Sequence, residues 1–129
     1  MLKLIKHLLA DRAIYIALFC SILILVLSLM SVDYGIELDL DNSDKILHSF
    51  SYTVLCLSWL FYFKPLHNSK QKLAISFGVF SYGIIIEVLQ TVLTTYRTGS
   101  LYDVLANTIG IFIALVTFET IYKFIFQKI

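Results

Sequence analysis

Residues 13–32 are the most restrictive feature of this sequence, because twenty consecutive residues carry no charge. A helix of roughly 20 apolar residues is long enough to cross the hydrocarbon core of a bilayer. The basic segment before this run is also how a signal peptide begins. The run is long for the apolar part of such a peptide, however, and residues 29–32 make a poor cleavage site. We therefore predict a retained membrane-spanning helix.

Three further apolar stretches, at about residues 45–63, 72–93 and 101–122, extend this interpretation to the whole chain. A hydrophobic fraction of 59% with only 15% charged residues is too apolar for an ordinary soluble domain. We predict an all-α fold, an integral membrane four-helix bundle in which residues 1–129 form a single domain. Cys20 and Cys56 both fall within apolar runs and suggest neither a disulfide nor a zinc site.

The distribution of the ten Lys and Arg residues predicts the orientation of the bundle. All but Lys45 and Arg97 lie in the N-terminal segment, in the loop between the second and third helices, or at the C-terminus. Positive residues favour the cytoplasmic side, so we expect both termini to be cytoplasmic. Residues 33–41 would then form an outer loop whose alternating pattern suggests a short extended piece on the interface. The net charge of +1, without a basic stripe, excludes a nucleic-acid partner.

Polar residues gather in the outer part of three predicted helices. With a rise of about 1.5 Å per residue, His48 lies roughly 5 Å below its helix end, and Glu87 and Asn107 lie roughly 10 Å below theirs. They share helix faces with other polar or small residues at spacings of three or four: Asp44 and His48; Gly83, Glu87 and Gln90; Asp103 and Asn107. Because such groups turn away from lipid, we predict an outward-facing polar pocket.

Simpler roles exist for several of these residues. Asp44 suits a helix N-terminus, and Ser100 with Asp103 matches a capping box. Lys45 and Arg97 can extend to the membrane interface as long cations do.

Other polar residues fit a purely structural role. His48 is in a position where an interfacial histidine is common, and Gln90 and Asn107 can hydrogen-bond between helices. A purely structural role explains Glu87 least well, since a carboxylate inside a span costs roughly 2–3 kcal/mol unless it is paired or protonated.

Small residues and one further acid also have packing explanations. Gly83, Gly110 and Ala114 suggest close helix contacts. Glu119 lies one turn before Lys123, so we predict an i,i+4 pair between them.

The ordered polar motifs resemble those of the VanZ-like family of small bacterial membrane proteins. The matching residues, between about positions 33 and 115, are Asp44-Lys45-x-x-His48 with Tyr52, Glu87-x-x-Gln90, Arg97, Ser100, Asp103-Val-x-Ala-Asn107 and Gly110. Ser49 departs from the pattern, because an aromatic residue is expected after the histidine. The resemblance implies a multi-pass protein of the bacterial inner (cytoplasmic) membrane. It also implies a link to teicoplanin susceptibility, the property that gives the family its name.

Two functions fit these observations. In the first, the site binds or acts on a lipid or lipid-linked cell-envelope ligand at the outer leaflet, with Arg97 and Lys45 holding a phosphate or carboxylate. Glu87 and His48 are the candidate acid and base, and binding without catalysis fits equally well. The other residues assigned to binding are Asp44, Gln90, Ser100, Asp103 and Asn107. In the second, the polar cluster only fixes helix packing in a structural or partner-binding subunit.

The acids and histidine match no dedicated metal motif, so no metal site is assigned and the cofactor is unknown.

Overall fold

The computed structural model describes residues 1–30, 40–63, 68–95 and 100–127, and five α-helices occupy most of them. They are α1 (Leu2–Asp11), α2 (Ala13–Leu29), α3 (Leu40–Tyr62), α4 (Ser69–Leu93) and α5 (Leu101–Phe126). The prediction of an all-helical chain is confirmed. The four-helix membrane bundle with cytoplasmic termini stays a prediction. The predicted extended piece at 33–41 falls mainly outside the described residues, and α3 already includes its last two positions.

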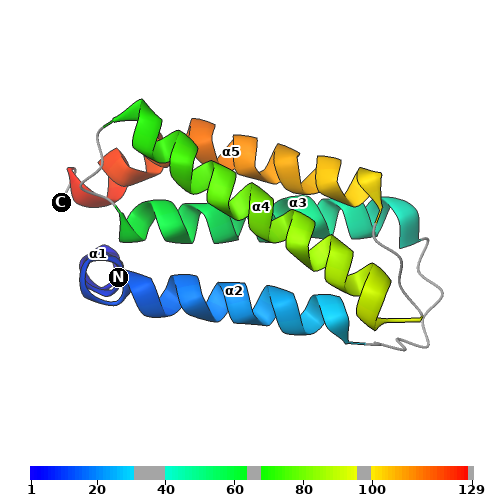
Figure 1. Ribbon diagram of the computed structural model, residues 1–129. Helices are drawn as coiled ribbons and strands as arrows, with labels where there is room; N and C mark the ends of the chain where they lie inside the picture. Colours follow the sequence, from blue (N-terminus) through cyan, green and yellow to red (C-terminus); the bar gives the residue numbers. More distant parts are fainter. Residues whose placement is uncertain (31–39, 64–67, 96–99, 128–129) are drawn as a thin grey trace.

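Helix α1 occupies a segment for which no helix was predicted. It meets α2 at an angle of 80° and lies beside the C-terminal ends of α3 and α5 (Figure 1). Ile5 and Leu9, one turn apart, pack against the hydrophobic core. This apolar spacing was a usable signal for an amphipathic helix.

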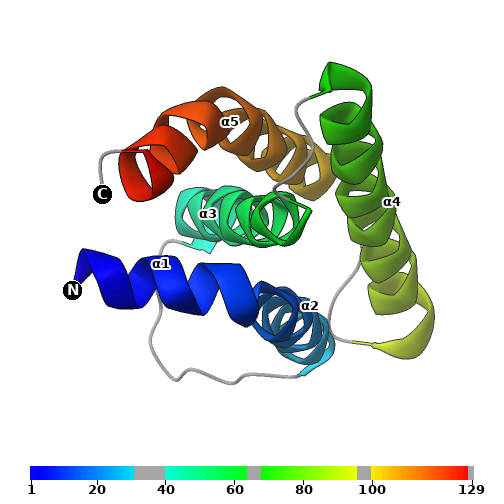
Figure 2. The same ribbon diagram turned by 90° about the vertical axis from the view of Figure 1, so that its left-hand side faces the viewer.

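Helix α3 lies in the middle of the molecule, in contact with all four other helices (Figure 2). Its second half supplies half of the buried apolar core, and α5 supplies most of the remainder. The buried cluster consists of Tyr52, Leu55, Cys56, Leu60 and Phe61 of α3, Val79 of α4, and Ile111, Ala114, Phe118 and Ile125 of α5.

Two helices, α4 and α5, are each long and apolar enough to cross a membrane. The bent pair of α1 and α2 would supply a third crossing if it acts as one span. Among the described helices, α3 falls short of this measure, because its first half carries Asp44, Lys45 and His48. A less apolar helix is tolerable at the centre, where neighbours shield much of it from lipid.

Gly110 allows α5 to approach α3 closely. A Cβ atom at this position would lie 2.1 Å from the backbone oxygen of Ser49, a distance that real side chains do not tolerate. The Thr53 hydroxyl lies 2.8 Å from the Ser49 carbonyl oxygen and 2.9 Å from that of Gly110. This tight crossing places the residue before Ser49, which is His48, directly against the preceding turn of α5.

Candidate functional site

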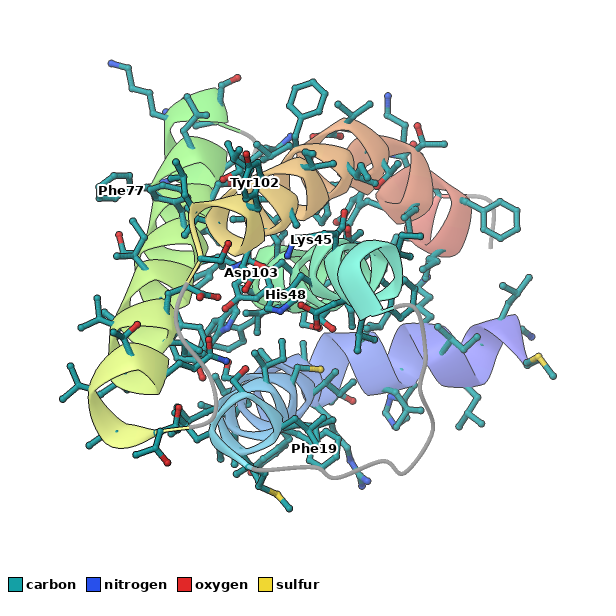
Figure 3. The ribbon with its side chains drawn as sticks, turned by 90° about the vertical axis from the view of Figure 1, so that its right-hand side faces the viewer. Phe19, Lys45, His48, Phe77, Tyr102 and Asp103 are labelled. Atoms are coloured by element: carbon teal, nitrogen blue, oxygen red, sulfur yellow. The ribbon has the colours of Figure 1, made fainter. Side chains whose placement is uncertain are left out.

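A cluster of polar side chains lies where α3 and α5 begin and α4 ends. Figure 3 views this end and shows Lys45, His48 and Asp103 between α3 and α5. Large apolar side chains such as Phe77 and Tyr102 point away from the helices in the same view, and each is about 70% exposed (69% and 71%). The molecule thus places polar groups inside and apolar groups outside, as a bilayer requires.

Lys45 and Asp103 connect the starts of α3 and α5. The Lys45 Nζ atom lies 2.7 Å from Asp103 Oδ1 and 3.9 Å from Asp44 Oδ2. The Asp103 side chain is only 11% exposed, so this charge is largely removed from solvent. Lys45 therefore turns toward the two carboxylates, whereas interface anchoring was the simpler prediction for it.

One ring nitrogen of His48 contacts α5, and the other faces a carboxylate of its own helix, α3. Its Nδ1 lies 3.1 Å from the Asn107 side-chain oxygen, and its Nε2 lies 3.7 Å from Asp44 Oδ2. A carboxamide oxygen can only accept, so His48 Nδ1 carries the proton in this hydrogen bond. The Nε2 atom faces the Asp44 carboxylate, an anion that would stabilise a proton taken up by this nitrogen.

Asn107 is 2% exposed, and its amide makes one hydrogen bond among the described residues. The Nδ2 donor is buried without a described partner and points toward Gly83 of α4, whose Cβ, if present, would lie 3.2 Å away. A buried amide donor left unsatisfied costs about 1–3 kcal/mol. Asn107 therefore keeps a donor beside His48 that no described residue uses.

Glu87 and Ser100 replace the predicted capping box at the start of α5. Ser100 caps the helix by accepting from the Tyr102 backbone N–H at 3.2 Å. In a capping box the acid three residues later would accept from the N–H of the capping residue. Here Glu87 of α4 takes that place, with its Oε2 3.2 Å from Ser100 N. Asp103 is thereby available to Lys45, and the helix dipole favours the Glu87 carboxylate.

Gln90 faces a different neighbour from the rest of the cluster. It is 2% exposed and donates from Nε2 to the backbone oxygen of Ser28 on α2, at 2.8 Å. This bond between helices is the structural role weighed for it from sequence. Arg97 lies outside the described residues.

A crevice of about 110 Å³ gives access to Asp44 and His48 from the side of α2. Ser51 and Tyr52 continue its wall on α3, and residues of α2 form the opposite wall. The α2 residues are Ile24, Leu27 and Ser28. Sequence reasoning had missed this wall, because an uncharged apolar run carries no signal of which residues face a site.

Asp44, His48 and Asp103 also form a group that can hold a metal ion, since one ligand atom from each lies within 4.8 Å of the others. The Lys45 ammonium contacts Asp103 at the same place. Its positive charge opposes a cation there, which weighs against a resident metal.

These features define a small helical membrane protein with a polar cluster at one end of its helices. The family model described as VanZ/LLP1 matches residues 13–125, and the chain belongs to this family. Comparison of the chain with curated proteins and with solved structures found no match.

Proposed function

We propose that the polar cluster binds the anionic headgroup of a lipid or lipid-linked cell-envelope compound at the outer leaflet of the bacterial cytoplasmic membrane. The observation that carries this proposal is His48, held by Asn107 and Asp44 and accessible through the crevice between α2 and α3. The distribution of Lys and Arg supports an outer position for this end. The ligand would enter the crevice directly from the bilayer.

Lys45 and Asn107 are the groups that we assign to the headgroup. An ammonium has three donors, so its pairing with Asp103 is compatible with a ligand contact. The buried Asn107 Nδ2 offers a further donor. Arg97, four residues after the end of α4 and outside the described residues, would add a bidentate cation if it turns toward the cluster.

His48 is the candidate base, and Asp44 would stabilise the imidazolium that forms when it takes a proton. Glu87 stays a candidate acid, although its Oε2 is engaged with the start of α5. If the ligand is only bound, the same residues serve for recognition.

Binding can be tested with a polyprenyl phosphate and the polyprenol of the same chain length. Purified protein in mild detergent would be examined by native mass spectrometry with each compound. We expect the phosphate to be retained and the alcohol to be lost. Lys45→Ala and His48→Ala should weaken retention about tenfold or more, which corresponds to roughly 1.4 kcal/mol.

His7 provides the matched control. It also lies next to an aspartate at i,i+4, with Nδ1 2.8 Å from Asp11 Oδ2, but this pair is exposed on α1. His7→Ala should bind as the wild type does. Equal retention of phosphate and alcohol by the wild type, or unchanged binding in both cluster variants, would contradict the proposal.

The proposal also bears on antibiotic susceptibility. A protein that sequesters or alters an envelope lipid would change the access of a lipoglycopeptide to its target, as the family resemblance implies. We expect expression in a susceptible Gram-positive host to raise the minimal inhibitory concentration of teicoplanin. The His48→Ala variant at equal abundance should not do so.

A purely structural role is the second candidate, favoured by the bonds of Gln90 to Ser28 and of Glu87 to Ser100. Both tie helices together without presenting a group to a ligand. Under this alternative, the Lys45→Ala and His48→Ala variants unfold at lower temperature and phosphate retention shows no dependence on them. Thermal unfolding in detergent, measured beside binding, separates the two.

A further inference from the structure

A second, larger cavity lies between α2, α3 and α4. Its volume is about 390 Å³, which falls in the range of pockets that bind small molecules. It is lined by Ser21 of α2, Leu55, Trp59 and Phe63 of α3, and Ile75, Gly78, Val79 and Tyr82 of α4. Gly78 and Phe63 are exposed, so the cavity reaches the molecular surface.

If α4 spans the membrane, the opening faces the hydrocarbon part of the bilayer rather than water. Gly78 is the tenth of the 25 residues of α4, one of the two helices suited to span a membrane. At about 1.5 Å per residue it lies roughly 14 Å from the start of the helix. The polar atoms of the wall bond to each other: Trp59 Nε1 donates to Ser21 Oγ at 3.2 Å, and the Tyr82 hydroxyl donates to the Ser21 backbone oxygen. The surface left for a ligand is apolar.

Gly78 is an unusual residue for this place. A Cβ atom there would have nothing within 4 Å, whereas Gly110 and Gly83 have neighbours that a Cβ would meet at 2.1 and 3.0 Å. Glycine inside a helix costs about 1 kcal/mol relative to alanine. Packing explains Gly110 and Gly83 but gives no reason for Gly78. What the missing side chain does achieve is to keep the cavity open.

The cavity and the crevice that contains His48 are neighbours along the same two helices. Both are walled by α2 and α3, and the crevice residues Ile24 and Tyr52 each lie three positions from the cavity residues Ser21 and Leu55. Along these helices the lining is polar beside His48 and becomes apolar about one turn further on. This is the pattern that a lipid requires, with a headgroup at one end and a hydrocarbon chain at the other.

We propose that this cavity holds the hydrocarbon chain of the same lipid molecule whose headgroup lies at His48. The inference rests on the proposed function and adds a determinant of chain recognition to it. It assigns a specific role to Gly78: a larger side chain there would exclude the chain while leaving the polar cluster intact.

The test compares two substitutions that introduce the same side chain one turn apart on α4. Both positions are exposed, but Gly78 lines the cavity and Ala74 does not, so only Gly78→Leu adds a side chain at the cavity wall. Native mass spectrometry would measure binding of a long-chain polyprenyl phosphate and of ethyl phosphate, a short-chain probe whose two carbons do not reach the cavity. We expect Gly78→Leu to weaken long-chain binding about tenfold or more while short-chain binding is unchanged. Ala74→Leu should bind both probes as the wild type does.

Three outcomes would overturn the inference. The first is wild-type long-chain binding by Gly78→Leu, with short-chain binding still dependent on His48, which leaves the proposed function standing. The second concerns a bilayer phospholipid that co-purifies with the protein. If Gly78→Leu removes this phospholipid and His48→Ala does not, the cavity is a general lipid site. The third is failure of the wild type to bind either probe, which removes the proposed function as well.

A second measurement does not depend on a substitution. A polyprenyl phosphate carrying a photoreactive diazirine in its second isoprene unit would be crosslinked to the wild-type protein. We expect labelled peptides to include Trp59 or Ile75, and addition of the unlabelled phosphate should compete. Labelling confined to the exposed outer faces of α4 and α5 would contradict the inference.

Discussion

Helix α5 carries an acid near each end, and the two acids form different kinds of ion pair. At the site end, Asp103 pairs with Lys45 of α3, and its side chain is 11% exposed. At the other end, Glu119 pairs with Lys72 of α4, and its side chain is 48% exposed. The Lys72 ammonium also lies 5.5 Å from the centre of the Phe118 ring. The predicted pair of Glu119 with Lys123 is thus replaced by a pair between helices.

The surroundings explain what each pair can do. Asp103 and Lys45 adjoin Asp44, His48 and Asn107, groups that can exchange protons or bind a ligand. The Glu119 end is packed with aromatic rings, including Phe61 and Phe118 at 5.1 Å. A similar charge pair therefore belongs to a polar site at one end and to a helix contact at the other. Four predictions, in order of decreasing expected effect, test this difference.

The largest effect is expected for Gly110→Ala, because Gly110 lies between the two acids and holds α3 against α5. The added Cβ would meet the Ser49 backbone oxygen, which cannot move as a side chain can. Overpacking of this kind costs about 3 kcal/mol or more when backbone must shift. Thermal unfolding in detergent should show a large decrease in Tm.

Gly78→Ala is the matched control for this substitution. Its Cβ meets nothing within 4 Å, so the gain in helix propensity should stabilise the protein by about 1 kcal/mol. Equal Tm changes in the two variants would contradict the close α3–α5 contact.

Neutralising each acid in turn should show whether the two ends of α5 differ in their effects on stability and ligand binding. Asp103→Asn leaves Lys45 without its nearest carboxylate oxygen, and we expect a loss of about 1–3 kcal/mol, between the values for exposed and buried pairs. Phosphate retention should decrease as well. Glu119→Gln should cost less than about 1 kcal/mol, because that acid is half exposed, and should leave retention unchanged. A greater effect of Glu119→Gln on retention would remove the distinction between the ends.

The loss of the His48 ring should have an intermediate effect on stability. His48→Ala leaves the buried Asn107 amide without its described partner, at a cost of about 1–2 kcal/mol. His7→Ala removes a similar but exposed Asp–His pair and should change stability by less than about 0.5 kcal/mol. Chemical unfolding of both variants in the same detergent measures the difference. Equal costs would show that the Asn107 contact contributes nothing.

The smallest effect on stability is expected for Glu87→Gln. A glutamine oxygen can still accept from the Ser100 N–H, and the loss of charge assistance in this bond costs about 0.5–1 kcal/mol. If Glu87 acts as an acid, function should be lost in a protein that unfolds almost as the wild type does. If the wild type proves to raise teicoplanin resistance and this variant raises it equally, Glu87 has a helix-capping role only.

Much of the helical layout could be predicted, because long apolar runs and capping residues act locally. Ser100 caps α5, and α5 begins at Leu101, the position predicted from the sequence. α4 begins at Ser69 rather than at residue 72, since Asn68 caps it by accepting from the Lys70 N–H. Helix α1 was missed because its segment was considered only for its positive charges.

The sequence by itself determined that the chain is helical and suited to a membrane, and which polar residues are costly in such a place. It also determined that Asp44 and His48, or Asp103 and Asn107, share a helix face, because a helix repeats every 3.6 residues. Only the tertiary structure decided the partners across helices. Glu87 caps α5, Asp103 pairs with Lys45, and Gln90 turns to Ser28. These pairings depend on how closely and at what angle helices cross, which the tight contact at Gly110 fixes and no local pattern records.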